Sequence, residues 1–149
     1  MRGRCPCLPA GRSATEYSLS NANMKALPAW SNLLFLLPLG MAVYFRIWLS
    51  AVILCAVLIS SFVYHLSRQK KLAHTDALLA KVLILSNVWI CYLGRFSLPW
   101  FAATLILAGL ALYFYFCEQN KNYILWHGLW HLSSALITVF SILTFLGGS

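Results

Sequence analysis

Five long apolar segments constrain the fold of this 149-residue chain more than any other feature. They cover residues 29–45, 47–67, 75–94, 97–117 and 123–146. At a rise of about 1.5 Å per helical residue, segments of this length cross a hydrocarbon core of about 30 Å. Lipid offers no partner to an unpaired backbone group, and the segments do not alternate as barrel strands do, so each must be a helix. The sequence therefore predicts an all-α fold, a polytopic membrane bundle of five transmembrane helices.

Composition excludes a water-soluble domain. Hydrophobic residues make up 61% of the chain and charged residues only 9%, too few polar side chains to cover a surface in water. The net charge of +8 at first suggests a nucleic-acid partner, but most of the basic residues stand at the ends of apolar segments. Membrane proteins distribute positive charge in this way. We therefore expect the lipid bilayer as partner and no nucleic acid.

Residues 1–28 differ from the rest of the chain, because they are polar, basic and without apolar periodicity. They are expected to form a disordered tail in front of the helical bundle of residues 29–149. A secretory signal over residues 24–45 is the alternative, but that stretch is long and has no small-residue cleavage site followed by a soluble body. Cys5 and Cys7 in the tail could bind a metal or carry a lipid, and unpaired cysteines are the favoured interpretation.

Basic residues also predict an orientation. Eight of the 11 lysines and arginines fall on the side of the N-terminal tail, two fall on the opposite side, and Lys81 lies within the third segment. Because lysine and arginine collect in short cytoplasmic loops, the N-terminus is predicted inside and the C-terminus outside.

Five polar residues stand out in segments that are otherwise apolar. The second segment ends in an S-x-x-x-H pattern, Ser61 and His65, and the fifth begins with H-x-x-x-H, His127 and His131. Spacing of four places each pair on one helix face. Asp76 opens the third segment. Helices that alternate in direction bring all five residues to the same membrane face, where polar side chains are costly unless they face a partner, a metal or water.

The donor set favours a catalytic zinc ion. Three histidines, His65, His127 and His131, leave one coordination position of Zn²⁺ for a water molecule, which zinc activates near neutral pH. Asp76 is the expected general base and acid for that water. Ser61 is expected to hydrogen-bond the developing oxyanion or to hold the water.

This constellation resembles the CREST superfamily of membrane hydrolases, which includes alkaline ceramidases, progestin and adipoQ receptors, lipid remodellers and the myomaker group. The shared pattern is S-x-x-x-H in one helix, an aspartate at the start of the next and H-x-x-x-H in the last helix. The resemblance implies a zinc-dependent hydrolase that cleaves an amide or ester bond of a membrane lipid, with a ceramide-like amide as one candidate. That superfamily has seven helices and this chain has five, which thins the wall around a lipid pocket unless subunits associate as a homo-oligomer.

Each site residue also has an ordinary interpretation, which for Ser61 is a hydrogen bond back to a carbonyl group of its own helix. His127 and His131 could belong to an interfacial aromatic belt, and His65 could be an interfacial histidine beside Tyr64. Asp76 could be a carboxylate at a helix N-terminus that Thr75 caps. For the whole protein, the alternatives are a receptor or scaffold in which zinc is structural, and an ion or proton pathway that uses Asp76, Lys81 and the histidines.

Overall fold

The computed structural model describes residues 31–67, 69–120 and 123–148, and the described residues are helical apart from short connections. A 3₁₀ turn, η1 (Asn32–Phe35), leads directly into α2 (Leu36–Tyr44). Four longer helices follow: α3 (Trp48–Ser67), α4 (Lys70–Leu93), α5 (Trp100–Asn120) and α6 (Tyr123–Gly148). The all-α prediction is therefore confirmed, while the tail predicted over residues 1–28 lies outside the described residues.

Four of the described helices are long and apolar enough to cross a membrane, namely α3, α4, α5 and α6. The first predicted segment is different, because Asn32–Tyr44 forms a shorter apolar helix in the described part of the chain. At about 1.5 Å per residue this stretch falls short of a hydrocarbon core of about 30 Å. The described residues thus contain four helices that can cross a membrane, as expected of an integral membrane protein.

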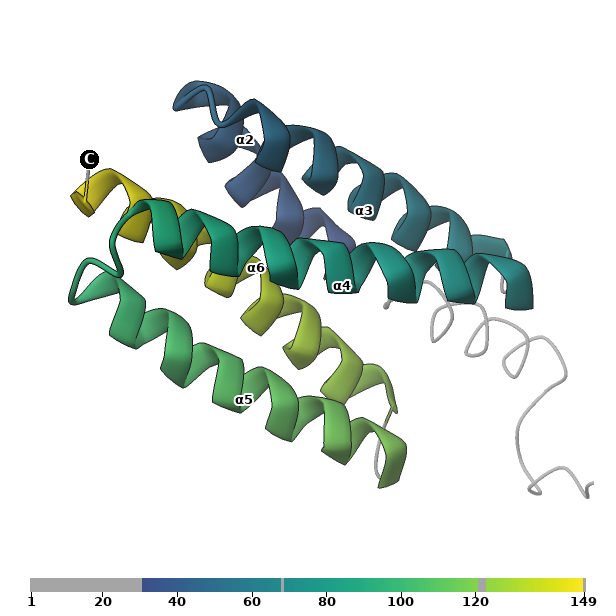
Figure 1. The fold of residues 1–149 in the computed structure, drawn as a ribbon. Coiled ribbons are helices and arrows are strands. Elements are labelled where there is room, and N and C mark those ends of the chain that lie inside the picture. The colour runs from purple at the N-terminus through teal and green to yellow at the C-terminus, as the bar shows by residue number, and fades with distance from the viewer. Residues whose placement is uncertain (1–30, 68, 121–122, 149) are drawn as a thin grey trace, which may run out of the picture.

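Helices that are consecutive in the sequence pack against each other, except for α4 and α5. α2 lies against α3 and α6, α3 lies against α4, and α5 lies against α6 (Figure 1). α4 packs on α6 but makes almost no direct contact with α5, the helix that follows it in the chain. In the α2–α3 and α4–α5 connections, Arg46 and the pair Arg95 and Phe96 adopt left-handed backbone conformations, with φ between 51° and 58°.

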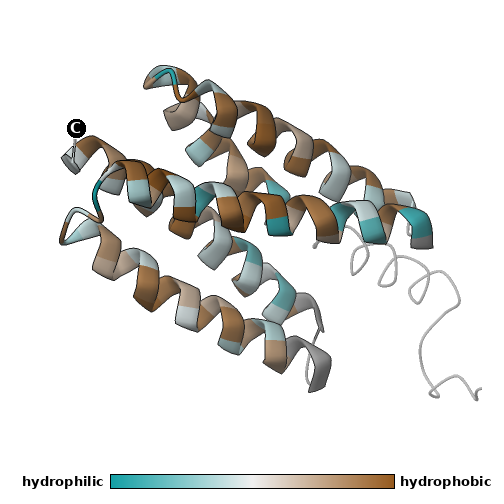
Figure 2. Ribbon diagram, in the orientation of Figure 1, coloured by the Kyte–Doolittle hydropathy of each residue, from teal (hydrophilic) through white to brown (hydrophobic). Residues whose placement is uncertain are grey.

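The bundle has two ends. At the proximal end α3 and α5 end and α4 and α6 begin, and at the distal end lie the α2–α3 and α4–α5 connections and the end of α6 (Figure 1). Apolar residues cover most of each helix, and hydrophilic residues gather near the beginning of α4 (Figure 2). The proximal end is therefore where polar chemistry can lie within reach of the membrane boundary.

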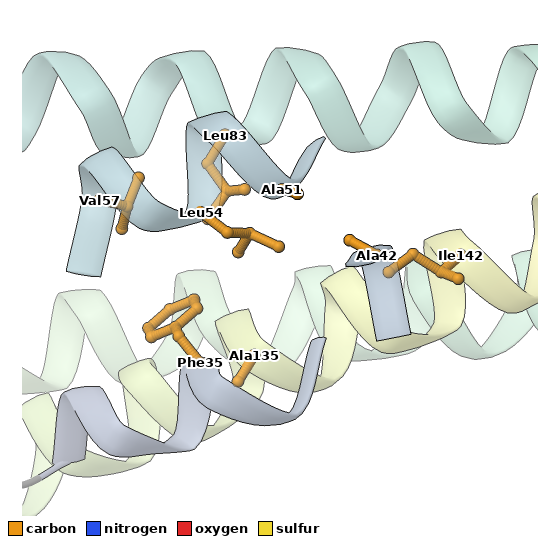
Figure 3. Close-up of a cluster of buried hydrophobic side chains, with 8 residues drawn as sticks. All are labelled: Phe35, Ala42, Ala51, Leu54, Val57, Leu83, Ala135 and Ile142. Atoms are coloured by element: carbon orange, nitrogen blue, oxygen red, sulfur yellow. The ribbon is translucent and has the colours of Figure 1, made fainter. Parts of the chain in front are cut away.

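A small apolar core joins the helices below that end. Eight buried side chains from η1, α2, α3, α4 and α6 form it (Figure 3): Phe35, Ala42, Ala51, Leu54, Val57, Leu83, Ala135 and Ile142. The buried stripe of α3 continues from this core to Ser61 and His65. Because of the helical spacing, Ser61 and His65 lie on the same buried face of α3 as its apolar core residues.

Candidate metal centre

The three predicted histidine ligands converge inside the proximal end of the bundle. His65 ends the buried stripe of α3, while His127 and His131 lie one turn apart near the beginning of α6. Their side chains are 7%, 8% and 2% exposed, respectively. Histidines of an interfacial aromatic belt would face the outside of the bundle, so burial contradicts that interpretation for all three.

Distances between the three rings are short. The ring centroids of His127 and His131 lie 4.4 Å apart, and the centroid of His65 lies 4.9 Å from that of His127 and 5.7 Å from that of His131. The Nε2 atoms of His65 and His127 are 3.2 Å apart. One ring nitrogen from each histidine lies within 4.8 Å of the other two.

This geometry fits a shared cation. Two imidazole nitrogens that bind one zinc ion at about 2.0–2.1 Å in a tetrahedral arrangement stand about 3.3 Å apart. The separation of 3.2 Å between the Nε2 atoms of His65 and His127 is close to that value. Three neutral imidazoles are also the donor set that divalent transition metals prefer. Residues His65, His127 and His131 could therefore hold a metal ion.

Asp76 and Ser61 lie beside the histidines. Ser61 is buried on the stripe of α3 one turn before His65, and its hydroxyl group donates a hydrogen bond to Oδ1 of Asn32 at 3.1 Å. Asp76 is half-buried and lies near enough to Ser61 and to His127 to interact with both. The five residues expected from the sequence thus occupy one region of the proximal end.

The beginning of α4 corrects the ordinary interpretation of Asp76. Sequence reasoning started this helix at residue 75, but α4 begins at Lys70, so Asp76 lies well inside the helix. Gln69 occupies the N-cap position, and the Thr75 hydroxyl donates to the backbone carbonyl of Lys71 at 3.4 Å. Asp76 is therefore neither capped by Thr75 nor placed among the free backbone N–H groups of a helix N-terminus.

Two residues at the start of the described chain belong to the site and were missed by sequence reasoning. The Ser31 hydroxyl is 2.8 Å from Nδ1 of His131, and Asn32 accepts the hydrogen bond from Ser61. Phe35 meets the His131 ring edge-on at a centroid distance of 6.1 Å. Serine and asparagine at the start of an apolar segment have no spacing relation to a histidine 100 positions later, so no motif could have indicated them.

A long apolar cavity begins beside the candidate metal centre. It has a volume of about 460 Å³, within the range of small-molecule sites. Ser61, Asp76 and His131 line its proximal part, and Cys91, Phe96 and Phe101 line its distal part. Between Asp76 and Cys91, α4 rises by about 22 Å at 1.5 Å per residue. The cavity is therefore elongated and runs along the helices from the polar residues toward the distal end.

Comparisons of the chain with protein-family models, with curated proteins and with solved structures find no match. The resemblance to the CREST superfamily stays a prediction that rests on five residues and their order.

Proposed function

We propose that this protein is a zinc-dependent integral-membrane hydrolase that cleaves an amide or ester bond of a membrane lipid, with a ceramide-like amide as one candidate substrate. The observation that carries the proposal is the position of three buried, convergent histidines beside a carboxylate, at one end of a long apolar cavity. A metal site that only joined helices would need neither the carboxylate nor the cavity.

In the proposed reaction, the three histidines bind the metal ion and Asp76 transfers protons. Zn²⁺ held by His65, His127 and His131 would activate a water molecule and polarise the scissile carbonyl group. Asp76 accepts the proton of the attacking water and returns it to the leaving group, as general base and then general acid. Its half-buried position beside His127 suits that exchange.

The hydrogen bond of Ser61 supports one of the two roles expected for it. A hydroxyl group has a single proton, and the Ser61 hydroxyl has two acceptors within the protein, Oδ1 of Asn32 and the neighbouring carboxyl group of Asp76. The Ser61 oxygen is therefore left to accept a hydrogen bond. We assign Ser61 to holding the attacking water, and we do not assign it to donating to the oxyanion.

The cavity supplies the place for a lipid chain and a route for its entry. Ile84 and Val88 on α4 and Leu105 and Leu112 on α5 line the cavity and are each more than half exposed. They come from two helices that make almost no direct contact with each other. We propose that the substrate enters sideways from the bilayer between these two helices.

The membrane arrangement in the proposal has five spans, and η1 and α2 are the described part of the first span, which the sequence predicts over residues 29–45. The distribution of lysine and arginine then places the N-terminus and the metal centre on the cytoplasmic side. The CREST pattern has two further helices between the Asp76 helix and the H-x-x-x-H helix, and their absence leaves an open wall between α4 and α5 in the proposed arrangement. Association with a second copy of the chain would close that wall.

Hydrolysis of a lipid amide by purified protein tests the proposal. In detergent micelles with a ceramide carrying a labelled acyl chain, the wild type is expected to release fatty acid, and chelation of the metal is expected to stop the release. Asp76→Asn should keep the metal but lose activity by at least about 100-fold, the scale of general acid–base catalysis. His127→Ala should lose metal and activity together.

The contrasting outcomes separate this proposal from a scaffold. Hydrolysis that persists after complete removal of metal would refute a metal-dependent enzyme. Stoichiometric zinc with no release from labelled ceramides or from ester lipids, in the wild type as in Asp76→Asn, would instead indicate a receptor or scaffold with structural zinc.

A further inference from the structure

The 3₁₀ turn η1 and its N-cap residue Ser31 present three side chains to the candidate metal centre. We call Ser31, Asn32 and Phe35 the N-terminal clamp. Residues three apart in a 3₁₀ helix lie on the same face, which places Asn32 and Phe35 together on the inner side of the turn. Their side chains are 1% and 4% exposed, whereas Leu33 and Leu34 on the other side are 42% and 38% exposed.

Each member of the N-terminal clamp contacts a residue of the site on another helix. Ser31 binds Nδ1 of His131 on α6 at 2.8 Å, and Phe35 packs edge-on against the same ring. Oδ1 of Asn32 accepts a hydrogen bond from the Ser61 hydroxyl group on α3 at 3.1 Å. The turn therefore joins α3 and α6 through the two helices' own site residues.

The contact with His131 bears directly on metal binding. An imidazole that donates Nδ1–H to a hydroxyl oxygen keeps its Nε2 lone pair for a metal, and the partner on Nδ1 also fixes the direction of the ring. Phe35 limits rotation of the same ring from the side. Both contacts come from a segment 96 to 100 positions before His131 in the sequence.

We infer that Ser31 is a positioning residue of the metal centre and that docking of the N-terminal clamp and metal binding stabilise each other. The inference rests on the proposed metal site and adds a means of regulating it. Because coupling between two binding equilibria is reciprocal, any event that undocks η1 weakens the metal site, and metal binding favours the docked turn.

Metal titration of the full chain tests the first half of the inference. The protein is purified in detergent, stripped with a chelator and titrated with Zn²⁺ against a chromophoric competitor. Ser31→Ala is expected to bind one ion with an affinity about 10- to 100-fold lower than that of the wild type, the usual effect of losing a partner of a metal-bound histidine. Ser31→Thr retains the hydroxyl group and should bind Zn²⁺ with an affinity close to that of the wild type. Leu33→Ala, on the outer side of the same turn, should match the wild type.

Hydrogen–deuterium exchange tests the reciprocal half and does not require any variant to bind tightly. Addition of Zn²⁺ to the stripped wild type should slow exchange of the backbone amides of residues 32–36. In Ser31→Ala that protection should be reduced at the same fractional occupancy.

The outcomes distinguish this inference from the proposed function. If the wild type binds zinc and Ser31→Ala binds it equally well, the inference is wrong and the metal site stands. Unchanged exchange of residues 32–36 on saturation with zinc would also overturn the inference. If the wild type binds no zinc at all, the proposed function and the inference both fail.

Discussion

At the scale of single residues, the site depends on how polar groups are satisfied inside a bundle that lipid surrounds. Asn32 and Ser61 are 1% and 5% exposed and pair with each other. A buried polar atom that loses its partner costs roughly 1–3 kcal/mol, whereas replacement of both partners by apolar groups is nearly neutral. The pair should therefore behave as one unit.

A double-mutant cycle measures that coupling. Asn32→Leu alone leaves the Ser61 hydroxyl buried without its acceptor and should lower the thermal unfolding midpoint in detergent. Addition of Ser61→Ala should recover part of the loss, with a coupling energy of about 1 kcal/mol. Strictly additive effects of the two substitutions would contradict the hydrogen bond.

Spacing along a helix was the part of the site that the sequence could predict. The i, i+4 relations of Ser61 with His65 and of His127 with His131 place each pair on one face, and the alternation of helices brings the faces to one end. Ser31 and Asn32 depend on a 3₁₀ turn and on the packing of η1 against α3 and α6. Those are tertiary properties that no local pattern contains.

At the scale of helices, α4 and α6 approach most closely at the distal end. A Cβ atom added to Gly94 would collide with the backbone of Thr144 and Phe145, and one added to Gly148 would collide with the backbone of Gly94. Close approach between these backbones, rather than an unusual φ, is what requires glycine here. The crossing holds the two helices that bear Asp76 and the histidine pair of α6 in register.

Gly94→Ala tests the importance of this crossing. The clash is with backbone atoms that cannot move aside, so we expect a loss of roughly 1–3 kcal/mol of stability, the range for overpacking, and a lower thermal unfolding midpoint. Gly109→Ala is the matched control, because it lies in α5 with open space around its Cβ position. It should be neutral or slightly stabilising, by at most about 1 kcal/mol. Equal effects of both substitutions would show that the close approach is unimportant.

Helix positions were predicted well from apolar runs, and their ends less well. The second and fifth predicted segments agree closely with α3 and α6, while α4 begins five residues earlier than its apolar run and α5 begins three residues later. Polar residues such as Lys71 and His74 extend α4 beyond the apolar stretch because a helix can continue out of the hydrocarbon region. Apolarity marks the part of a helix in lipid and does not mark its termini.

At the scale of the whole molecule, the number of spans decides the topology. With η1 and α2 as part of a fifth span, the two termini lie on opposite sides of the membrane. With only the four long helices crossing, both termini lie on the side of Arg46. Reporters of membrane sidedness fused to each end of the chain should therefore report opposite sides, with the N-terminus in the cytoplasm. Termini on the same side would contradict the five-span arrangement.

The metal content of the purified protein tests the central claim most directly. Elemental analysis of wild-type protein extracted in detergent without chelator should find about one zinc ion per chain, as expected for a site with three histidine ligands. His74→Ala, which removes an exposed histidine of α4, should retain it. His65→Ala and His127→Ala should carry almost none. Wild-type protein with no more metal than these two variants would contradict the account.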